Sequence, residues 1–365
     1  MAQKEKISIH QFTVLVILIT IGDAILVLPS TVTKEANQDA WLATLLALGF
    51  SLVFIYLFIV VSRLYQKLSF VQYSMKILGK WFGSIVSIFF LSYLFFSVTA
   101  HVRELGDFVT TQILIQTPIE VIVLLFVFII VMGVRSGLEP IARTSELLFP
   151  IVCFFLILLL TLLIPNIHVD WVQPILENGI KPVLKGTLSA TAFPFMELVV
   201  FLMILPSVNK KAEVKKSFFV GSIIGGIILI IVVLLCILVL GKEATIRNVY
   251  PTFILARVIH FENMIQRIEG ILATIWIVTA YLKITIYSYA LHLGFVHLLK
   301  LDGYRILTLP FGMILFASTI LVTPNISFFN QIISLYWPFY DATVAVILPL
   351  ILVIVFAIRK RLNTS

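Results

Sequence analysis

Long apolar stretches separated by short polar segments make up most of the chain. The two clearest run from Trp41 to Ser62 and from Ser217 to Leu240, and neither contains a charged residue. A helix needs about 20 apolar residues to cross a bilayer. The pattern therefore predicts an all-α polytopic membrane protein with about ten transmembrane helices. The predicted spans cover residues 10–32, 40–62, 82–100, 119–135, 146–164, 185–205, 217–240, 269–295, 306–323 and 338–358.

Composition supports a membrane protein and argues against an enzyme. Hydrophobic residues make up 61% of the 365 residues and charged residues 12%, whereas globular domains have about 45–50% and about 25%. Ten spans use most of the chain, so no loop is long enough to form a catalytic domain. Cys153 and Cys236 lie within apolar stretches, where a free cysteine behaves as a small hydrophobic residue.

The basic residues indicate topology and contact with lipid rather than nucleic acid. The formal net charge is +8, but the Lys and Arg residues are scattered through short loops, where they would lie beside the headgroups of the lipid bilayer. Of the 26, 17 fall on one side of the predicted spans and eight on the other, and Lys283 within a span is the last. Positive loops are retained inside, so both termini should be cytoplasmic.

Two of the predicted external segments are longer than the other loops. One covers residues 165–185 and the other residues 241–266. The second mixes apolar and aromatic side chains with charges, which favours a helix lying over the outer mouth of the protein. Its apolar and aromatic residues include Tyr250, Pro251, Phe253, Ile254 and Phe261.

Two of the predicted spans contain residues that interrupt a helix. Gly22 and Asp23 lie within the first span, and both residue types have low helix propensity. Pro194 lies within the sixth, where it lacks an N–H and clashes with the preceding turn. Each helix should open there and expose backbone groups that can bind a ligand's carboxylate or ammonium. The alternative is a simple kink, since Gly and Pro are common in membrane helices.

The two interrupted spans are five apart in order and run in opposite directions. This spacing predicts one transmembrane domain over residues 1–365, built as a 5+5 inverted repeat. The first repeat would cover about residues 10–164 and the second about residues 185–358. Interrupted helices at matching positions of two repeats are the best indication in a sequence of a transporter's binding site.

Asp23, Glu197 and Lys283 are ionisable and lie at mid-span. Such charges cost at least about 2.5–3.5 kcal/mol, so they should face the interior and serve function. Lys283 could occupy the place of a bound cation or pair with one carboxylate, and a purely structural ion pair is the alternative. No other acidic or basic group is expected at this depth.

Hydroxyl groups could reach the same region from the third and eighth spans, namely those of Tyr93, Thr285 and Tyr287, although the tyrosines could equally serve packing. The predicted ligand-binding set contains ten residues. They are Gly22, Asp23, Ala24, Tyr93, Thr191, Phe193, Pro194, Glu197, Lys283 and Tyr287.

The sequence predicts no cofactor and no metal site. The six histidines are scattered, and the only neighbouring pair has a spacing of five, which places its members on different helix faces. A Gly-rich phosphate loop and a Ser-His-Asp pattern are both missing. The histidines are His10, His101, His168, His260, His292 and His297.

Six motifs in order give the chain a resemblance to a known family. They are GDAILVLPS (22–30), GKWFG (79–83), GLEPIARTSELLFP (137–150), PILENGIKPVLKG (174–186), FPFMELVVFLMILP (193–206) and YPTFILARVIHFENMIQRIE (250–269). With these motifs the chain resembles the permease-like B subunits of bacterial endospore germinant receptors. That family is a branch of the amino acid–polyamine–organocation superfamily, and the likeness covers nearly the whole chain.

The resemblance implies a LeuT-like fold with broken first and sixth helices. It also implies a receptor complex with two other subunits in the spore inner membrane, and recognition of a small germinant, usually an amino acid. Lys283 is unusual for a simple amino-acid pocket, so the resemblance does not identify the ligand. The alternative function is a proton-coupled amino-acid transporter, which the same fold supports.

Overall fold

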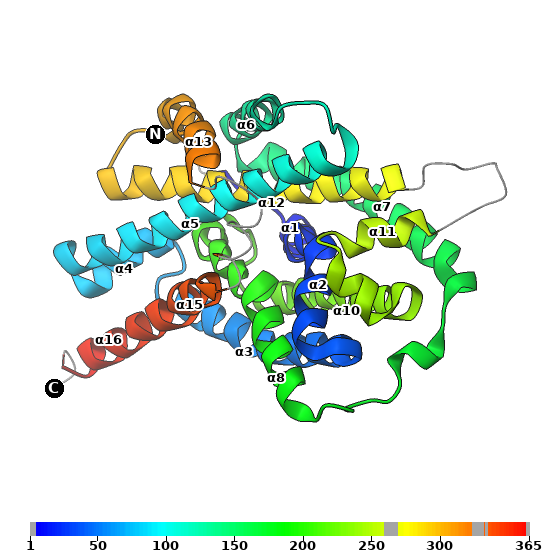
Figure 1. The fold of residues 1–365 in the computed structure, drawn as a ribbon. Helices are drawn as coiled ribbons and strands as arrows, with labels where there is room; N and C mark the ends of the chain where they lie inside the picture. The colour runs from blue at the N-terminus through cyan, green and yellow to red at the C-terminus, as the bar shows by residue number, and fades with distance from the viewer. Residues whose placement is uncertain (1–4, 259–268, 323–331, 333–334, 363–365) are drawn as a thin grey trace.

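The computed structural model describes residues 5–258, 269–322, 332 and 335–362, and its regular structure there is helical apart from one isolated bridge, between Ile7 and Val208 (Figure 1). Nine helices in this part are long and apolar enough to cross a membrane. One of them, residues 24–64, bends at η1 (Asn37–Asp39), and its first part continues the shorter apolar helix α1 (Ile9–Ile21). The helices therefore form ten spans, and the predicted all-α membrane fold is confirmed.

The first five spans follow the predicted order. The first consists of α1 (Ile9–Ile21) and α2 (Ala24–Ala36), and the second is α3 (Ala40–Leu64). The next three are α5 (Lys80–Phe108), α6 (Ile119–Ser136) and α7 (Leu138–Leu163). Short helices between and after them are α4 (Phe70–Leu78), η2 (Val109–Ile113), η3 (Ile164–Asn166) and η4 (Val169–Val172).

The second five spans begin with the other broken helix. It contains α8 (Ile180–Ala190), η5 (Thr191–Phe195), η6 (Met196–Val200), α9 (Phe201–Ile204) and η7 (Leu205–Ser207). The seventh, eighth and ninth spans are α10 (Val214–Arg247), α12 (Glu269–Leu299) and α13 (Thr308–Leu321). The tenth comprises α15 (Trp337–Ala342), η9 (Thr343–Ile347) and α16 (Leu348–Leu362), and the short elements are α11 (Pro251–Arg257) and η8 (Tyr304–Leu307).

Helix packing brings the two broken spans to the centre of the bundle. In Figure 1, α12 lies along α5, while α1 packs on α10 and α2 packs on α8. Phe12, Phe201 and Phe218 pack edge to face, with ring centroids 5.3–5.6 Å apart, and tie α1 to α9 and α10. Large apolar side chains such as Trp81 and Phe339 point outward, as lipid-facing positions require.

The segment before α1 fastens one end of the bundle. Glu5 accepts a hydrogen bond from the backbone N–H of Leu138 at the start of α7 (2.5 Å), and from the hydroxyl of Tyr304 (2.9 Å). Ile7 exchanges backbone hydrogen bonds with Ser207 and Asn209, just after the sixth span. The two broken spans are therefore joined at the end that the charge count predicts to be cytoplasmic.

The opposite end is covered by α11. The rings of Tyr250 and Phe253 pack against Phe108 at centroid distances of 5.1 and 5.2 Å, and Phe108 packs against Trp276 at 4.5 Å. The predicted helix over the mouth is thus present at residues 251–257. The outward orientation of this end of the bundle remains a prediction. The rest of that segment, with His260 and Phe261, lies outside the described residues.

Some span ends differ from the prediction. The helix α5 continues to Phe108 instead of ending at residue 100, and α7 begins at Leu138 instead of residue 146. Arg103, which the charge count placed in a loop, is buried within α5 and contacts Asp107 at 3.0 Å. Pairing at a spacing of four residues lets a helix continue past the end of its apolar stretch. The boundaries of the two repeats remain a prediction.

The orientation can be tested by cysteine labelling. In a chain lacking Cys153 and Cys236, a cysteine at Asn209 should react with a membrane-impermeant maleimide only in opened vesicles, because 17 of the 26 basic residues lie on that side. A cysteine at Asn178, in the opposite loop, should react in intact cells. Reversed labelling of the two positions would invert the topology.

Candidate functional site

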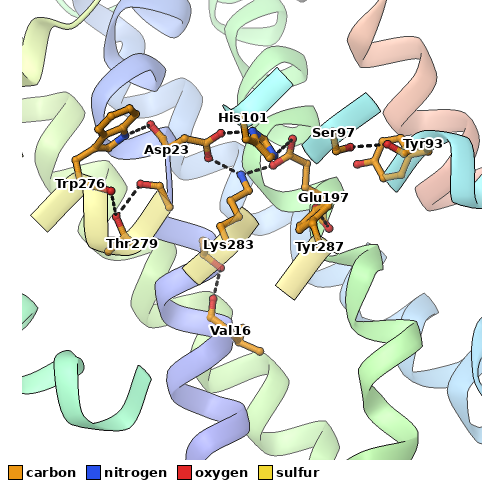
Figure 2. Close-up of polar contacts among 12 residues, drawn as sticks. Val16, Asp23, Tyr93, Ser97, His101, Glu197, Trp276, Thr279, Lys283 and Tyr287 are labelled. Atoms are coloured by element: carbon orange, nitrogen blue, oxygen red, sulfur yellow. Dashed lines mark hydrogen bonds and ion pairs between the residues drawn. The ribbon is translucent and has the colours of Figure 1, made fainter. Parts of the chain in front are cut away.

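The first helix is interrupted at Gly22 and Asp23. Gly22 has φ +29° and ψ −124°, which ends α1, and α2 begins one residue after Asp23. The opened turn makes carbonyl groups accessible to side chains of other helices, although the Asp23 carbonyl still accepts the backbone N–H of Leu26 (3.1 Å). Two side chains of α12 bind them: the hydroxyl of Thr279 donates to the Gly22 carbonyl (3.0 Å), and the indole N–H of Trp276 donates to the Asp23 carbonyl (3.4 Å) (Figure 2).

The sixth span is interrupted at Phe193 and Pro194, as predicted. Phe193 has φ −118° and ψ 116°, an extended conformation within an otherwise helical segment. The hydroxyl of Tyr287 on α12 donates to the backbone carbonyl of Glu197 just beyond this interruption (2.5 Å). Side chains of α12 therefore bind carbonyl groups at both interruptions. Thr191 donates to the Thr187 carbonyl of its own helix (2.7 Å).

Lys283 connects the two interrupted helices. Its Nζ lies 2.5 Å from Oδ1 of Asp23 and 2.5 Å from Oε2 of Glu197, and all three side chains are at most 2% exposed (Figure 2). The same ammonium lies 4.9 Å from the centroid of the Phe193 ring. The structure therefore places Lys283 with both carboxylates. Each charge depends on the others, because removing one partner of a buried ion pair leaves a charge without compensation.

Gly22 is needed for this arrangement by its size as well as its conformation. A Cβ atom at Gly22 would lie 2.7 Å from Cδ of Lys283 and 2.9 Å from the carbonyl oxygen of Ile19. The aliphatic part of the lysine passes directly over the glycine, which allows the ammonium to reach Asp23. A residue that the sequence marks only as a helix breaker thus also makes room for Lys283.

The structure adds His101 and Glu104 of α5 to the predicted set. His101 Nδ1 lies 2.6 Å from Oδ2 of Asp23, and its Nε2 lies 3.9 Å from Oε1 of Glu197. One oxygen of Glu104 lies within 4.8 Å of ligand atoms of both Asp23 and His101. The spacing of Tyr93, His101 and Glu104 along one helix face would have predicted this contact, had the third span been extended past residue 100.

Asp341 of α15 is the other acidic residue that sequence reasoning missed. It is fully buried, and neither carboxylate oxygen has a hydrogen-bond partner of normal geometry among the residues that the structure describes. It lies beside the hydroxyl of Tyr93 and near Glu197. The ring of Tyr93 packs edge to face on Tyr340, at a centroid distance of 5.3 Å. A single acidic residue within the predicted tenth span was the available signal.

The group of buried charged side chains around Lys283 is thus more acidic than the sequence suggested. The prediction that only two carboxylates lie at the depth of Lys283 is wrong, because two more carboxylates and a histidine are present. We call these six side chains the central cluster: Asp23, His101, Glu104, Glu197, Lys283 and Asp341. Four carboxyl groups face two basic side chains, so the cluster has room for further positive charge, as protons or as a bound cation.

A family model described as spore germination protein matches residues 6–327. The chain belongs to this family. It is 28% identical to spore germination protein KB of Bacillus subtilis (strain 168) over 363 residues, which are 98% of this chain and 96% of that protein. The resemblance inferred from the six motifs is therefore confirmed, and the family is of the permease type.

Solved transporter structures share the fold. Mhp1, a nucleobase-cation-symport-1 family transporter in a closed conformation with bromovinylhydantoin bound, superposes with a TM-score of 0.72 at 12% identity, covering 95% of this chain and 78% of that chain. MhsT in complex with L-phenylalanine gives a TM-score of 0.65 at 14% identity, covering 98% and 99%. These likenesses show that the chain has the LeuT-like fold of two inverted five-helix repeats.

Thr285 does not supply its hydroxyl to the central cluster, as the sequence suggested that it could. Thr285 donates to the Tyr281 carbonyl (2.7 Å) and packs toward Gly133 of α6. Ala24 is buried at the start of α2, where only its backbone could contact a ligand. The predicted roles of the ten residues in ligand binding remain predictions, and the structure brings Asp23, Glu197 and Lys283 into direct contact.

Proposed function

We propose that this chain is the germinant-sensing, permease-like subunit of a spore germination receptor, and that it binds a small molecule of the amino-acid class at mid-membrane. The observation that carries the proposal is the contact of Asp23 and Glu197, one from each broken helix, with Lys283. Family membership supports a role in germination, and the position between two interrupted helices is typical of substrate sites in this architecture.

The charges of an amino acid match those of the central cluster. Its ammonium can bind Asp23 or Glu197, and its carboxylate can bind Lys283, so the ligand would replace the contacts that these groups now make with one another. It would also compete with Thr279 and Tyr287 for the carbonyls of the interruptions. A ligand that binds one arrangement of the helices more tightly than another shifts the population toward it.

The signal would pass to the other subunits of the receptor in the spore inner membrane, with both termini of this chain in the cytoplasm. Lys283 belongs to α12, which lies against α5, α6, α7 and α1. A change in its ion pairs therefore acts on helices of both repeats. Replacing one set of buried contacts by another converts a small local change into a different packing of helices.

A proton-coupled amino-acid transporter is the second candidate. It is favoured by the excess of carboxylates, because buried acidic groups can bind and release protons. In this reading, Asp341 and Glu104 would bind the coupled protons while Asp23 and Glu197 contact the substrate. The fold suits both functions equally well.

The deciding experiment compares assembly with transport. An affinity tag on this chain should co-purify the other receptor subunits from spore inner membranes, and spores lacking the chain should lose germination with one or more single L-amino acids. The purified chain in liposomes should not accumulate that amino acid, with or without a proton gradient. Purification as a single chain together with proton-driven uptake would contradict the receptor and establish the transporter.

A further inference from the structure

Three side chains of the central cluster form a set of ligands typical of metal ions. Ligand atoms of Asp23, His101 and Glu104 all lie within 4.8 Å of one another. His101 and Glu104 are three residues apart on α5, so they share one helix face. The same spacing of a carboxylate and an imidazole supplies ligands for metal ions in helical bundles.

These side chains have polar atoms that the protein does not satisfy. Nε2 of His101 and Oε1 of Glu104 are shielded from solvent and make no hydrogen bond within the described residues, while Oδ2 of Asp23 contacts only Nδ1 of His101 among them, at 2.6 Å. Asp23 is 1% exposed and His101 is 6% exposed. Burying polar atoms without partners costs free energy, so such atoms together indicate a bound species.

The contacts of Lys283 leave this part of the cluster available. Lys283 contacts Oδ1 of Asp23 and Oε2 of Glu197. The second oxygen of each carboxylate, Oδ2 of Asp23 and Oε1 of Glu197, lies on the side of His101. When ionised, the four carboxylates of the central cluster carry four negative charges, and Lys283 balances one of them. With a neutral imidazole, three negative charges remain, and a divalent cation offsets two of them.

We propose that Asp23, His101 and Glu104 bind a divalent transition-metal ion of the class Mn²⁺, Fe²⁺, Co²⁺ or Zn²⁺. Carboxylate oxygens alone would suit Mg²⁺ or Ca²⁺, but an imidazole ligand favours first-row transition metals. The ion joins the start of α2 to α5 and holds Asp23 in position for Lys283. This role is independent of the identity of the germinant.

A shared proton is the competing explanation. His101 Nδ1 and Asp23 Oδ2 lie 2.6 Å apart, which is also the distance of a strong hydrogen bond. A metal ion and a proton differ in what can be measured. A transition metal binds with a fixed stoichiometry, gives a ligand-field spectrum when it is Co²⁺, and stabilises the folded protein at constant pH.

The test uses the full-length chain purified in detergent, with any subunits that co-purify, after treatment with a chelator. Addition of Co²⁺ should give one bound ion per chain and visible absorption bands, and Zn²⁺ or Mn²⁺ should raise the Tm while Mg²⁺ does not. His101→Ala and Glu104→Gln should each weaken Co²⁺ binding at least about tenfold. His292→Ala, another buried histidine, and Glu120→Gln, an exposed glutamate, are the matched controls and should bind normally.

If the wild-type chain binds no Co²⁺ at 100 µM, or if Glu104→Gln and His101→Ala bind it as well as the controls, the three residues hold a proton instead. Glu104→Gln preserves the size and shape of the side chain, so it keeps the test decisive if His101→Ala does not fold.

Discussion

Replacing Lys283 by methionine should abolish the germination response or shift its half-maximal amino-acid concentration upward by more than about tenfold. The ammonium is the partner of both Asp23 and Glu197, at 2.5 Å from each. A hydrogen bond to a charged group contributes about 1.5–3 kcal/mol, and about 1.4 kcal/mol corresponds to a factor of ten. Loss of optical density in spores exposed to the active amino acid measures the response.

Lys283→Arg should be less harmful than Lys283→Met, because arginine keeps the charge although its planar group does not fit the same space. Lys216→Met is the matched control, since Lys216 is exposed, and it should respond normally. Protein levels in the inner membrane must be similar in all three variants. A normal response of Lys283→Met across pH would mean that the lysine is only a tolerated packing residue.

Lys283→Met should also lower the stability of the folded protein, apart from its effect on germination. Breaking a buried ion pair by removing one partner costs about 3–5 kcal/mol. Glu197→Gln combined with Lys283→Met removes one of the unbalanced charges, so the double variant should have a higher Tm than Lys283→Met alone. It should not regain the germination response, because the ammonium is still missing. The two measurements thus separate the role of Lys283 in the fold from its role in sensing.

Much of the fold follows from the sequence because each membrane helix is predicted by its own apolar residues. The interruptions were also local signals, because Gly22 has low helix propensity and Pro194 lacks an N–H and clashes with the preceding turn. Their separation by five spans was enough to predict the inverted repeat. Proline alone did not show which helices would open, since Pro29 and Pro150 lie within continuous helices.

The composition of the central cluster could be predicted only in part. His101 and Glu104 lie beyond the apolar stretch of the third span, so hydropathy alone ended that helix before them. Inside the protein they face other polar groups rather than lipid, and the helix continues. A polar residue at the end of an apolar stretch therefore marks either the membrane surface or an inward-facing polar site, and hydropathy does not separate the two.

The partner of Lys283 depended on tertiary structure. Asp23 and Glu197 are 260 and 86 residues away along the chain, and both lie at helix interruptions. The pairing with both follows from the position of α12, whose side chains bind carbonyls at each interruption. No pattern within the eighth span specifies that position, so the sequence could name the candidates but could not choose between one partner and two.

Replacing Gly22 by leucine should abolish the germination response while the protein still reaches the membrane. A Cβ atom there would lie 2.7 Å from Cδ of Lys283, and Gly22 has φ +29°, which L-residues rarely adopt. The side chain would displace the lysine from Asp23, and the sparsely populated backbone conformation would add about 1–3 kcal/mol of strain. Gly22→Ala should produce a smaller defect of the same kind. Dose–response curves with immunoblots of the membrane fraction measure both.

Gly49→Leu is the matched control, because Gly49 lies on an exposed face of α3 with open space around its Cβ position, and its response should be normal. The proposed cause can be checked by combining substitutions. If the glycine acts by making room for Lys283, Gly22→Ala should add little to the defect of Lys283→Met, since residues in contact have non-additive effects. Fully additive defects, or an unchanged dose response of Gly22→Leu, would show that the ligand and the lysine do not depend on this space.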